Sequence, residues 1–200
     1  MARRNKHSLD EIREMVLDAA ETITINEGYS ALTVSKIAMD IGYTVGSIYM
    51  VFANMADLLM HIKANTVDEL TGQLQQVQGY PPEQQLMELA KAYLQFAVQN
   101  FNRWTLIYMP DAETPDWYRQ KVDGIFSLVE AQFAQLAPTR SAQQHKQAAL
   151  ALWSGVHGIC TLSLTGKLDA EGINDVENTL VLLVESFIGG WTASLLTKNQ

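Results

Sequence analysis

The fold is decided by residues 33–52, which read Thr33-Val-Ser-Lys-Ile-Ala-Met-Asp-Ile-Gly-Tyr-Thr-Val-Gly-Ser-Ile-Tyr-Met-Val-Phe52. A helix-turn-helix needs two short helices that cross steeply, a tight turn and apolar residues on the facing sides. Gly42 falls where the turn needs a residue that tolerates positive φ. Any short helical hairpin has similar spacing, so this stretch predicts the hairpin and leaves DNA binding open. The facing residues are Val34, Ile37, Ala38 and Ile41, followed by Tyr43, Ile48 and Val51.

Helical spacing continues on both sides of this stretch, and strand alternation persists nowhere. Ser8 and Glu11 form a capping-box pattern for a helix that ends at Gly28. Thr33, Thr44 and Asn54 are the expected caps of the next three helices. The sequence predicts an all-α fold of about nine helices. The later helices are expected from Asn54 to about Gln78, from Pro82 through Phe101, and over 116–136, 141–165 and 174–197.

Residues 27–58 carry a longer pattern around the hairpin: Gly28-Tyr29, Leu32-Thr33-Val34, Ile37-Ala38, Gly42, Gly46-Ser47-Ile48-Tyr49, Phe52, Asn54 and Asp57-Leu58. This pattern closely resembles the N-terminal domain of the TetR/AcrR family of bacterial transcriptional regulators. The stretch Leu152-Trp-Ser-Gly-Val-His-Gly158 resembles the branch of the family with a Trp…His-Gly (WHG) signature. The resemblance implies a three-helix helix-turn-helix DNA-binding domain over 1–54 and a larger helical domain for ligand sensing and dimerisation over 55–200.

The resemblance also implies which residues meet DNA. The helix over about 44–51 is expected to enter the major groove of a double-stranded operator. Simple helix capping is an alternative role for each hydroxyl, and for Thr33 and Thr44 the two roles are compatible. The expected contacts come from a basic N-terminal arm, from the start of the preceding helix and from the groove helix itself: Arg3, Arg4, Lys6, Thr33, Ser35, Lys36, Thr44, Val45, Gly46, Ser47, Tyr49 and Met50.

The charge distribution separates this chain from the common family pattern. The net charge of −8 by itself argues against a protein that coats nucleic acid without sequence preference. Residues 1–55 alone contain five basic and seven acidic residues, a net charge of −2. Val45, Met50 and Met55 stand where family members commonly have Lys or Arg, His and Lys. We therefore expect few phosphate contacts and a shallow salt dependence, with Val45 and Met50 contacting thymine methyl groups. The alternative is a helical ligand- or protein-binding module with weak or lost DNA binding.

The family resemblance implies that the C-terminal part senses a small effector and forms a dimer, and aromatic and small residues there are the candidates for these roles. The expected pocket for a small, largely apolar or aromatic effector is lined by Phe96, Phe101, Trp104, Tyr108, Trp117, Phe126, Trp153 and His157. Plain core is the alternative for the aromatic residues, and a satisfied buried histidine is the alternative for His157. Glycine inside a helix costs about 1 kcal/mol, which close helix packing can offset. A homodimer interface is therefore expected at Ala151, Gly155, Gly158, Ser186, Gly190 and Ala193, with packing inside one chain as the alternative.

Other classes of protein find little support. The four histidines fall on separate segments, Cys160 stands alone, and there is no nucleophile elbow, phosphate loop or dinucleotide motif, so we expect no enzyme, metal or cofactor. Two apolar stretches, 148–165 and 180–196, contain Gly, Ser and Thr and lack a basic flank, so buried helices are expected rather than membrane spans. No secretory signal is visible, which favours the cytoplasm. The predicted function is a ligand-responsive regulator, a repressor by the family's common mode, that binds a pseudo-palindromic operator as a homodimer and is released by an inducer.

Overall fold

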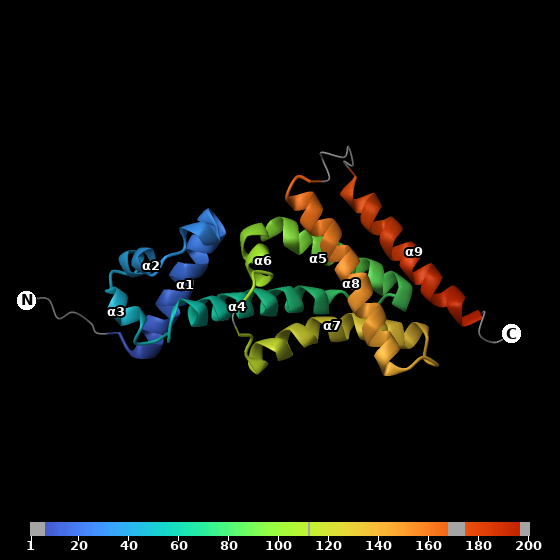
Figure 1. Cartoon of the computed structure of the whole chain (residues 1–200), viewed down its shortest axis with the longest axis horizontal. Coiled ribbons are helices and arrows are strands. Elements are labelled where there is room, and N and C mark those ends of the chain that lie inside the picture. The colour runs from blue at the N-terminus through green and yellow to red at the C-terminus, as the bar shows by residue number, and fades with distance from the viewer. Residues whose placement is uncertain (1–6, 112, 168–174, 197–200) are drawn as a thin grey trace, which may run out of the picture. The chain divides into compact units, whose positions relative to one another are not determined.

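The computed structural model describes residues 7–111, 113–167 and 175–196, and the side chains of these residues up to 193. The expected basic arm, Arg3, Arg4 and Lys6, lies outside the described residues. All regular elements in the described part are helices (Figure 1). They form two compact units, which we call the first unit (Met1–Asp68 with Asn100–Tyr118) and the second unit (Glu69–Gln99 with Arg119–Gln200).

The helices follow the local capping signals of the sequence. The first unit contains α1 (Leu9–Glu27), the short 3-10 helix η1 (Tyr29–Ala31), α2 (Val34–Asp40), α3 (Val45–Ile48), the beginning of α4 (Met55–Gln76) and α6 (Phe101–Ile107). Glu11 N–H donates to Ser8 Oγ at 3.2 Å and Ser8 N–H donates to the Glu11 carboxylate at 2.6 Å, which confirms the predicted capping box. Asn54 accepts a hydrogen bond from the Asp57 N–H at 2.9 Å, so the predicted cap of α4 is also confirmed.

The core of the first unit holds the helix-turn-helix in place. Figure 1 shows α2 and α3 beside α1, and the three helices contact one another. Gly42 has φ 69° in the turn between α2 and α3, a conformation that glycine adopts without steric cost. The buried side chains come from α1 to α4 and α6: Ile12, Val16, Ala20, Ile23, Leu32, Ile37, Ala38, Ile48, Phe52, Leu58, Ile62 and Leu106.

The second unit packs longer helices. It contains the end of α4, α5 (Pro82–Gln99), most of α7 (Asp116–Leu136), α8 (Ala142–Leu164) and α9 (Val176–Leu196). Figure 1 shows α8 and α9 side by side, and both contact α5. Phe133 on α7 packs against Phe187 and Trp191 of α9 with ring centroids 5.9 and 5.5 Å apart. The guanidinium of Arg140 lies 3.6 Å from the centroid of the Trp191 ring and donates to the Trp191 carbonyl at 2.8 Å.

Two helix boundaries differ from the sequence prediction. The helix expected from Pro82 through Phe101 ends at Gln99, because Asn100 leaves the helical conformation (φ −122°, ψ 32°), and α6 begins at Phe101. The helix expected over 44–51 is regular only over Val45–Ile48 and continues as turns closed by bonds such as Val51 N–H to the Ile48 carbonyl. The compact first unit also includes residues 55–68 and 100–118, and the division into a DNA-binding domain over 1–54 and a sensing domain over 55–200 stays a prediction.

The two apolar stretches that invited a membrane interpretation belong to α8 and α9. None of the helices within the described residues combines the length and the hydropathy that a bilayer crossing requires.

Candidate functional site

The short helix α3 is held by its cap and by one buried side chain. Ser47 N–H donates to Thr44 Oγ1 at 3.3 Å, and Lys36 N–H donates in the same way to Thr33 Oγ1 at 3.2 Å. Each threonine oxygen acts as acceptor in its cap, which leaves the hydroxyl proton as a possible donor to a phosphate oxygen. The Thr44 hydroxyl also lies 3.0 Å from the Ser47 hydroxyl, where either oxygen can donate. Ile48 is 1% exposed and anchors α3 to the core of the first unit. The capping role is therefore confirmed for both threonines and leaves a phosphate contact open.

The outward side of this segment presents uncharged side chains. We call Thr44, Val45, Gly46, Ser47, Tyr49 and Met50 the reading surface. Val45 is 37% exposed, Tyr49 49% and Met50 67%. Ser35, on the first turn of α2, is exposed as well. The predicted DNA-contacting residues within the described part thus lie at the surface and on neighbouring turns of α2 and α3.

The two described basic residues among positions 7–55 already have partners inside the first unit. Lys36 Nζ lies 2.5 Å from the Glu27 carboxylate. Arg13 donates to the Val51 carbonyl at 2.8 Å, lies 2.8 Å from His61 Nε2 and sits 4.3 Å from the centroid of the Phe52 ring. Burial and the Arg13 charge lower the pKa of His61, which favours the neutral imidazole as acceptor. Sequence reasoning had identified Lys36 and had missed Glu27 as its partner.

A third cation of the first unit is buried. Lys63 on α4 is 1% exposed, and its ammonium donates to the Met109 carbonyl at 2.8 Å and to Asp111 at 2.6 Å. These bonds fix the segment that follows α6 onto α4. Trp117, from the predicted pocket, stacks on His61 with ring centroids 5.2 Å apart.

The predicted aromatic pocket is divided between the two units. Phe101, Trp104, Tyr108 and Trp117 belong to the first unit, and Phe96, Phe126, Trp153 and His157 belong to the second. Trp104 and Phe96 are buried core residues, whereas Phe101, Tyr108 and Trp117 are partly exposed. The eight residues therefore do not line one continuous cavity within either unit.

The aromatic members of the second unit gather around Trp153. Its ring centroid lies 4.4 Å from that of Tyr93 and 5.5 Å from that of Phe126. The Tyr93 hydroxyl lies 2.8 Å from His157 Nδ1, and burial lowers the pKa of His157, so the neutral ring accepts the hydroxyl proton. The void beside Trp153 and Tyr93 measures about 10 Å³, at the lower limit for a single water. This cluster is packed, as the plain-core alternative expects.

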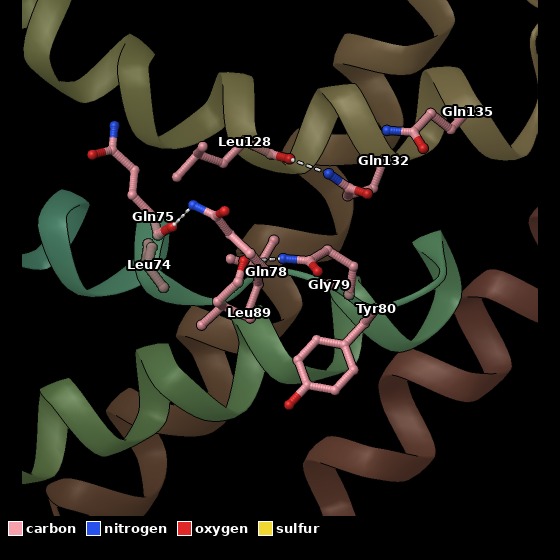
Figure 2. Close-up of a pocket in the computed structure, with 11 residues that line it drawn as sticks. Leu74, Gln75, Gln78, Gly79, Tyr80, Leu89, Leu128, Gln132 and Gln135 are labelled. Carbon is pink, nitrogen blue, oxygen red and sulfur yellow. Dashed lines mark hydrogen bonds between the residues drawn. The ribbon is translucent and has the colours of Figure 1, made fainter.

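An open pocket lies elsewhere in the second unit, and the sequence interpretation missed it. It has a volume of about 440 Å³ and is formed by the end of α4, the following turn, the start of α5 and the later part of α7. We call it the glutamine pocket (Figure 2). Its lining residues are Leu74, Gln75, Val77, Gln78, Gly79, Tyr80, Gln85, Leu89, Leu128, Gln132 and Gln135. The available signal was compositional, because residues 73–85 contain six glutamines.

The residues expected at a dimer interface separate into two groups. A Cβ atom at Gly155 would lie 2.8 Å from Leu183 Cδ2, so Gly155 serves packing of α8 on α9 within one chain. Ala151, Ser186, Gly190 and Ala193 are exposed, and a Cβ atom at Gly158 would meet nothing within 4 Å. Leu150, Leu162 and Leu182 are 54%, 42% and 66% exposed on the same two helices.

Cys160 lies on α8 and is fully buried. Burial raises the pKa of its thiol to about 12, so the thiolate that would be needed for nucleophilic or metal chemistry is suppressed.

A helix-turn-helix with an exposed second helix, carried by a chain with a larger helical body and a pocket, defines a DNA-binding regulator with a sensing domain. The comparisons agree. Residues 16–62 match the family of bacterial regulatory proteins named tetR, and residues 86–187 match the tetracyclin repressor-like C-terminal domain. The chain belongs to the TetR family of transcriptional regulators, which confirms the family resemblance of residues 27–58 and the non-enzymatic class.

One relative and two solved structures are similar over most of the chain. An uncharacterized HTH-type transcriptional regulator, Rv0681 of Mycobacterium tuberculosis, is 26% identical over 172 residues, which are 85% of this chain and 78% of that protein. The structure of BioQ with its double-stranded DNA operator aligns with a TM-score of 0.64 at 18% identity, covering 88% of this chain and 98% of BioQ. The structure of FadR from Bacillus subtilis in complex with stearoyl-CoA aligns with a TM-score of 0.63 at 16% identity, over 88% of this chain and 98% of FadR.

Proposed function

We propose that this regulator is a repressor that binds a pseudo-palindromic operator as a homodimer in the cytoplasm and is released by a small, largely apolar inducer. The observation that carries the proposal is the reading surface: an exposed, capped and anchored α3 whose outward side chains are Val45, Tyr49 and Met50. In a helix-turn-helix, the second helix lies in the major groove and its first residues contact base edges. Val45 stands at that end of α3, and Tyr49 and Met50 are exposed directly after it.

The paired cations support a mode of recognition with little phosphate attraction. Lys36 is held by Glu27 and Arg13 by Val51 and His61, so neither side chain is free to neutralise a phosphate without giving up a partner. Affinity for DNA then depends on hydroxyl contacts from Thr33, Ser35 and Thr44, together with apolar contact between the reading surface and thymine methyl groups. We expect a shallow dependence of operator affinity on salt.

The exposed face of α8 and α9 supports the homodimer. Leu150, Gly158 and Leu162 recur at four- or eight-residue intervals on α8, and Leu182, Ser186 and Gly190 recur every four residues on α9. Residues four apart share one face of a helix, so each helix presents leucines beside small side chains. Two such faces can pack closely as a four-helix interface. In such a two-fold dimer we expect the two copies of α3 about 34–36 Å apart, the spacing of successive major grooves.

The packed aromatic cluster supports an apolar inducer. The void beside Trp153 and Tyr93 holds only about 10 Å³ and is otherwise lined by aliphatic side chains, so an effector must displace a side chain of this cluster to enter. A ligand that binds the opened cluster better than the closed one shifts the population toward the opened state. The FadR structure contains stearoyl-CoA, whose acyl chain is of this chemical class. Release of operator would follow if the opened state binds DNA less well.

The test is operator binding by Tyr49→Ala. Fluorescence anisotropy with DNA that flanks the protein's own gene measures the dissociation constant. We expect the substitution to weaken binding by roughly ten- to a hundredfold, since it removes an exposed aromatic contact at the DNA surface. Tyr80→Ala is the matched control. The exposed fraction of Tyr80, 44%, is similar to that of Tyr49, but Tyr80 belongs to the second unit.

Equal affinities for the wild type, Tyr49→Ala and Tyr80→Ala would contradict the proposal and favour the alternative, a helical binding module without DNA recognition. A reporter gene placed behind the bound fragment then separates repression from activation.

A further inference from the structure

We propose that the glutamine pocket is a second ligand site, distinct from the aromatic cluster, for a neutral hydroxyl-bearing molecule of the sugar or polyol class. The carrying observation is the lining of this pocket: five primary amides, one phenol and apolar side chains, with no ionisable carboxylate, ammonium or guanidinium among its lining residues. Its volume of about 440 Å³ falls within the range of about 300–1,000 Å³ that is common for small-molecule sites.

The absence of charge in the lining selects against charged ligands. A carboxylate, phosphate or ammonium that enters a pocket loses hydration, and a lining without counter-charges does not compensate for that loss. A hydroxyl group carries no such penalty and needs one donor and one acceptor, which a primary amide supplies from neighbouring atoms. The pocket chemistry therefore fits a ligand with several hydroxyl groups and no formal charge.

Three of the amides are oriented by the backbone. The Gln78 amide donates to the Gln75 carbonyl at 2.6 Å, Gln85 donates to the Val77 carbonyl, and Gln132 donates to the Leu128 carbonyl at 3.4 Å (Figure 2). A side-chain amide fixed through its nitrogen presents its oxygen in a defined direction as an acceptor. Because this orientation exists before a ligand arrives, binding costs less conformational entropy than it would with free glutamine side chains.

The remaining lining supplies apolar contact from more than one side. Leu74 and Leu89 come from α4 and α5, and Leu128 comes from α7. Tyr80 adds an aromatic ring in the turn between α4 and α5, and Figure 2 shows Gln132 and Gln135 on α7 across from that turn. Sugars combine C–H faces with hydroxyl edges, so apolar side chains and oriented amides in one pocket match both parts of such a molecule.

The experiment compares three probes of one ring shape and different charge: glucose, glucosamine and glucuronate. Saturation-transfer NMR on the full-length protein reports which probe binds. We expect a signal from glucose that exceeds the signals from the cationic and the anionic probe. Signals that are absent for glucose, or larger for either charged probe, would overturn the proposal.

A charge-introducing variant locates the site. Gln132→Glu places a carboxylate in the pocket, so we expect glucose binding to weaken roughly three- to tenfold and glucosamine to become the preferred probe. Gln95→Glu is the matched control, because Gln95 is an exposed residue of α5 that is not among the pocket's lining residues. If neither Gln132→Glu nor Gln95→Glu changes the glucose signal, glucose binds elsewhere and the proposal is overturned.

This inference and the proposed repressor function fail separately. Operator affinity without any probe is expected to be equal in Gln132→Glu and the wild type, whereas Tyr49→Ala changes operator affinity in either case.

Discussion

The two units hold their polar groups in different ways. In the first unit the cations are paired with fixed partners: Lys36 with Glu27, Lys63 with Asp111 and the Met109 carbonyl, and Arg13 with the Val51 carbonyl and His61. In the second unit the glutamine pocket is lined by neutral amides, and Arg140 lies on the ring of Trp191. Paired charges therefore hold the scaffold of the first unit, while shape and neutral hydrogen bonds define the glutamine pocket of the second unit.

This difference has a mechanical meaning for a regulator. Paired charges keep the short helices α2 and α3 and the segment after α6 in fixed positions, which suits a surface that must match a rigid groove. Neutral amides and aromatic rings tolerate rearrangement at lower cost, because no charge loses its partner when a ligand enters. We therefore expect substitutions that change charge to alter the stability or DNA affinity of the first unit, and substitutions that change side-chain volume to alter the stability of the second unit.

The largest expected effect concerns Lys63. Asp111→Ala leaves a lysine that is 1% exposed with only the Met109 carbonyl as partner, and we expect the free energy of unfolding to fall by about 2–3 kcal/mol. Urea denaturation monitored by tryptophan fluorescence measures this loss. Glu113→Ala removes an acid from the same segment and should change the stability by less than about 0.5 kcal/mol. Equal losses in the two variants would show that the ion pair does not stabilise the first unit.

A smaller effect is expected at Lys36, measured on DNA. Glu27→Gln releases the ammonium from its partner, so operator affinity should rise roughly three- to tenfold at low salt and the salt dependence should steepen by about two ions per dimer. Glu14→Gln, an exposed substitution on α1 with the same change in net charge, is the control. If both variants gain affinity equally, the gain reflects overall charge rather than the freed lysine.

The smallest effect tests volume in the second unit. A Cβ atom at Gly124 on α7 would meet nothing within 4 Å, so Gly124→Ala should stabilise the protein by about 1 kcal/mol through helix propensity. At Gly155 the added atom would lie 2.8 Å from Leu183 Cδ2, so Gly155→Ala should lose most of that gain to crowding. Thermal denaturation of the two variants compares them directly, and an equal rise in Tm would argue against tight packing of α8 on α9.

The sequence predicted what local chemistry determines. Ser8, Thr33, Thr44 and Asn54 cap helices through hydrogen bonds to residues three positions ahead, so a single sequence contains both partners. The helix-turn-helix was predictable for the same reason, since its apolar spacing and its turn glycine lie within 20 residues.

The missed features depend on distant segments. Glu27 and Lys36 belong to different helices, Lys63 and Asp111 are 48 residues apart, and the glutamine pocket joins α4, α5 and α7. The break at Asn100 falls where the chain passes from the second unit to the first, which helical periodicity does not report. The division of the expected pocket residues between two units follows from tertiary packing alone, which a single sequence does not report.

The burial of Cys160 has a practical consequence. The chain contains one thiol, and with its pKa raised to about 12 that thiol reacts slowly with maleimides at neutral pH. A cysteine introduced at an exposed site such as Ser35 or Ser186 would therefore take up a fluorophore or spin label almost alone. Distance measurements between labels at Ser35 would therefore test the proposed homodimer, because they report the separation of the two α2 helices with and without operator.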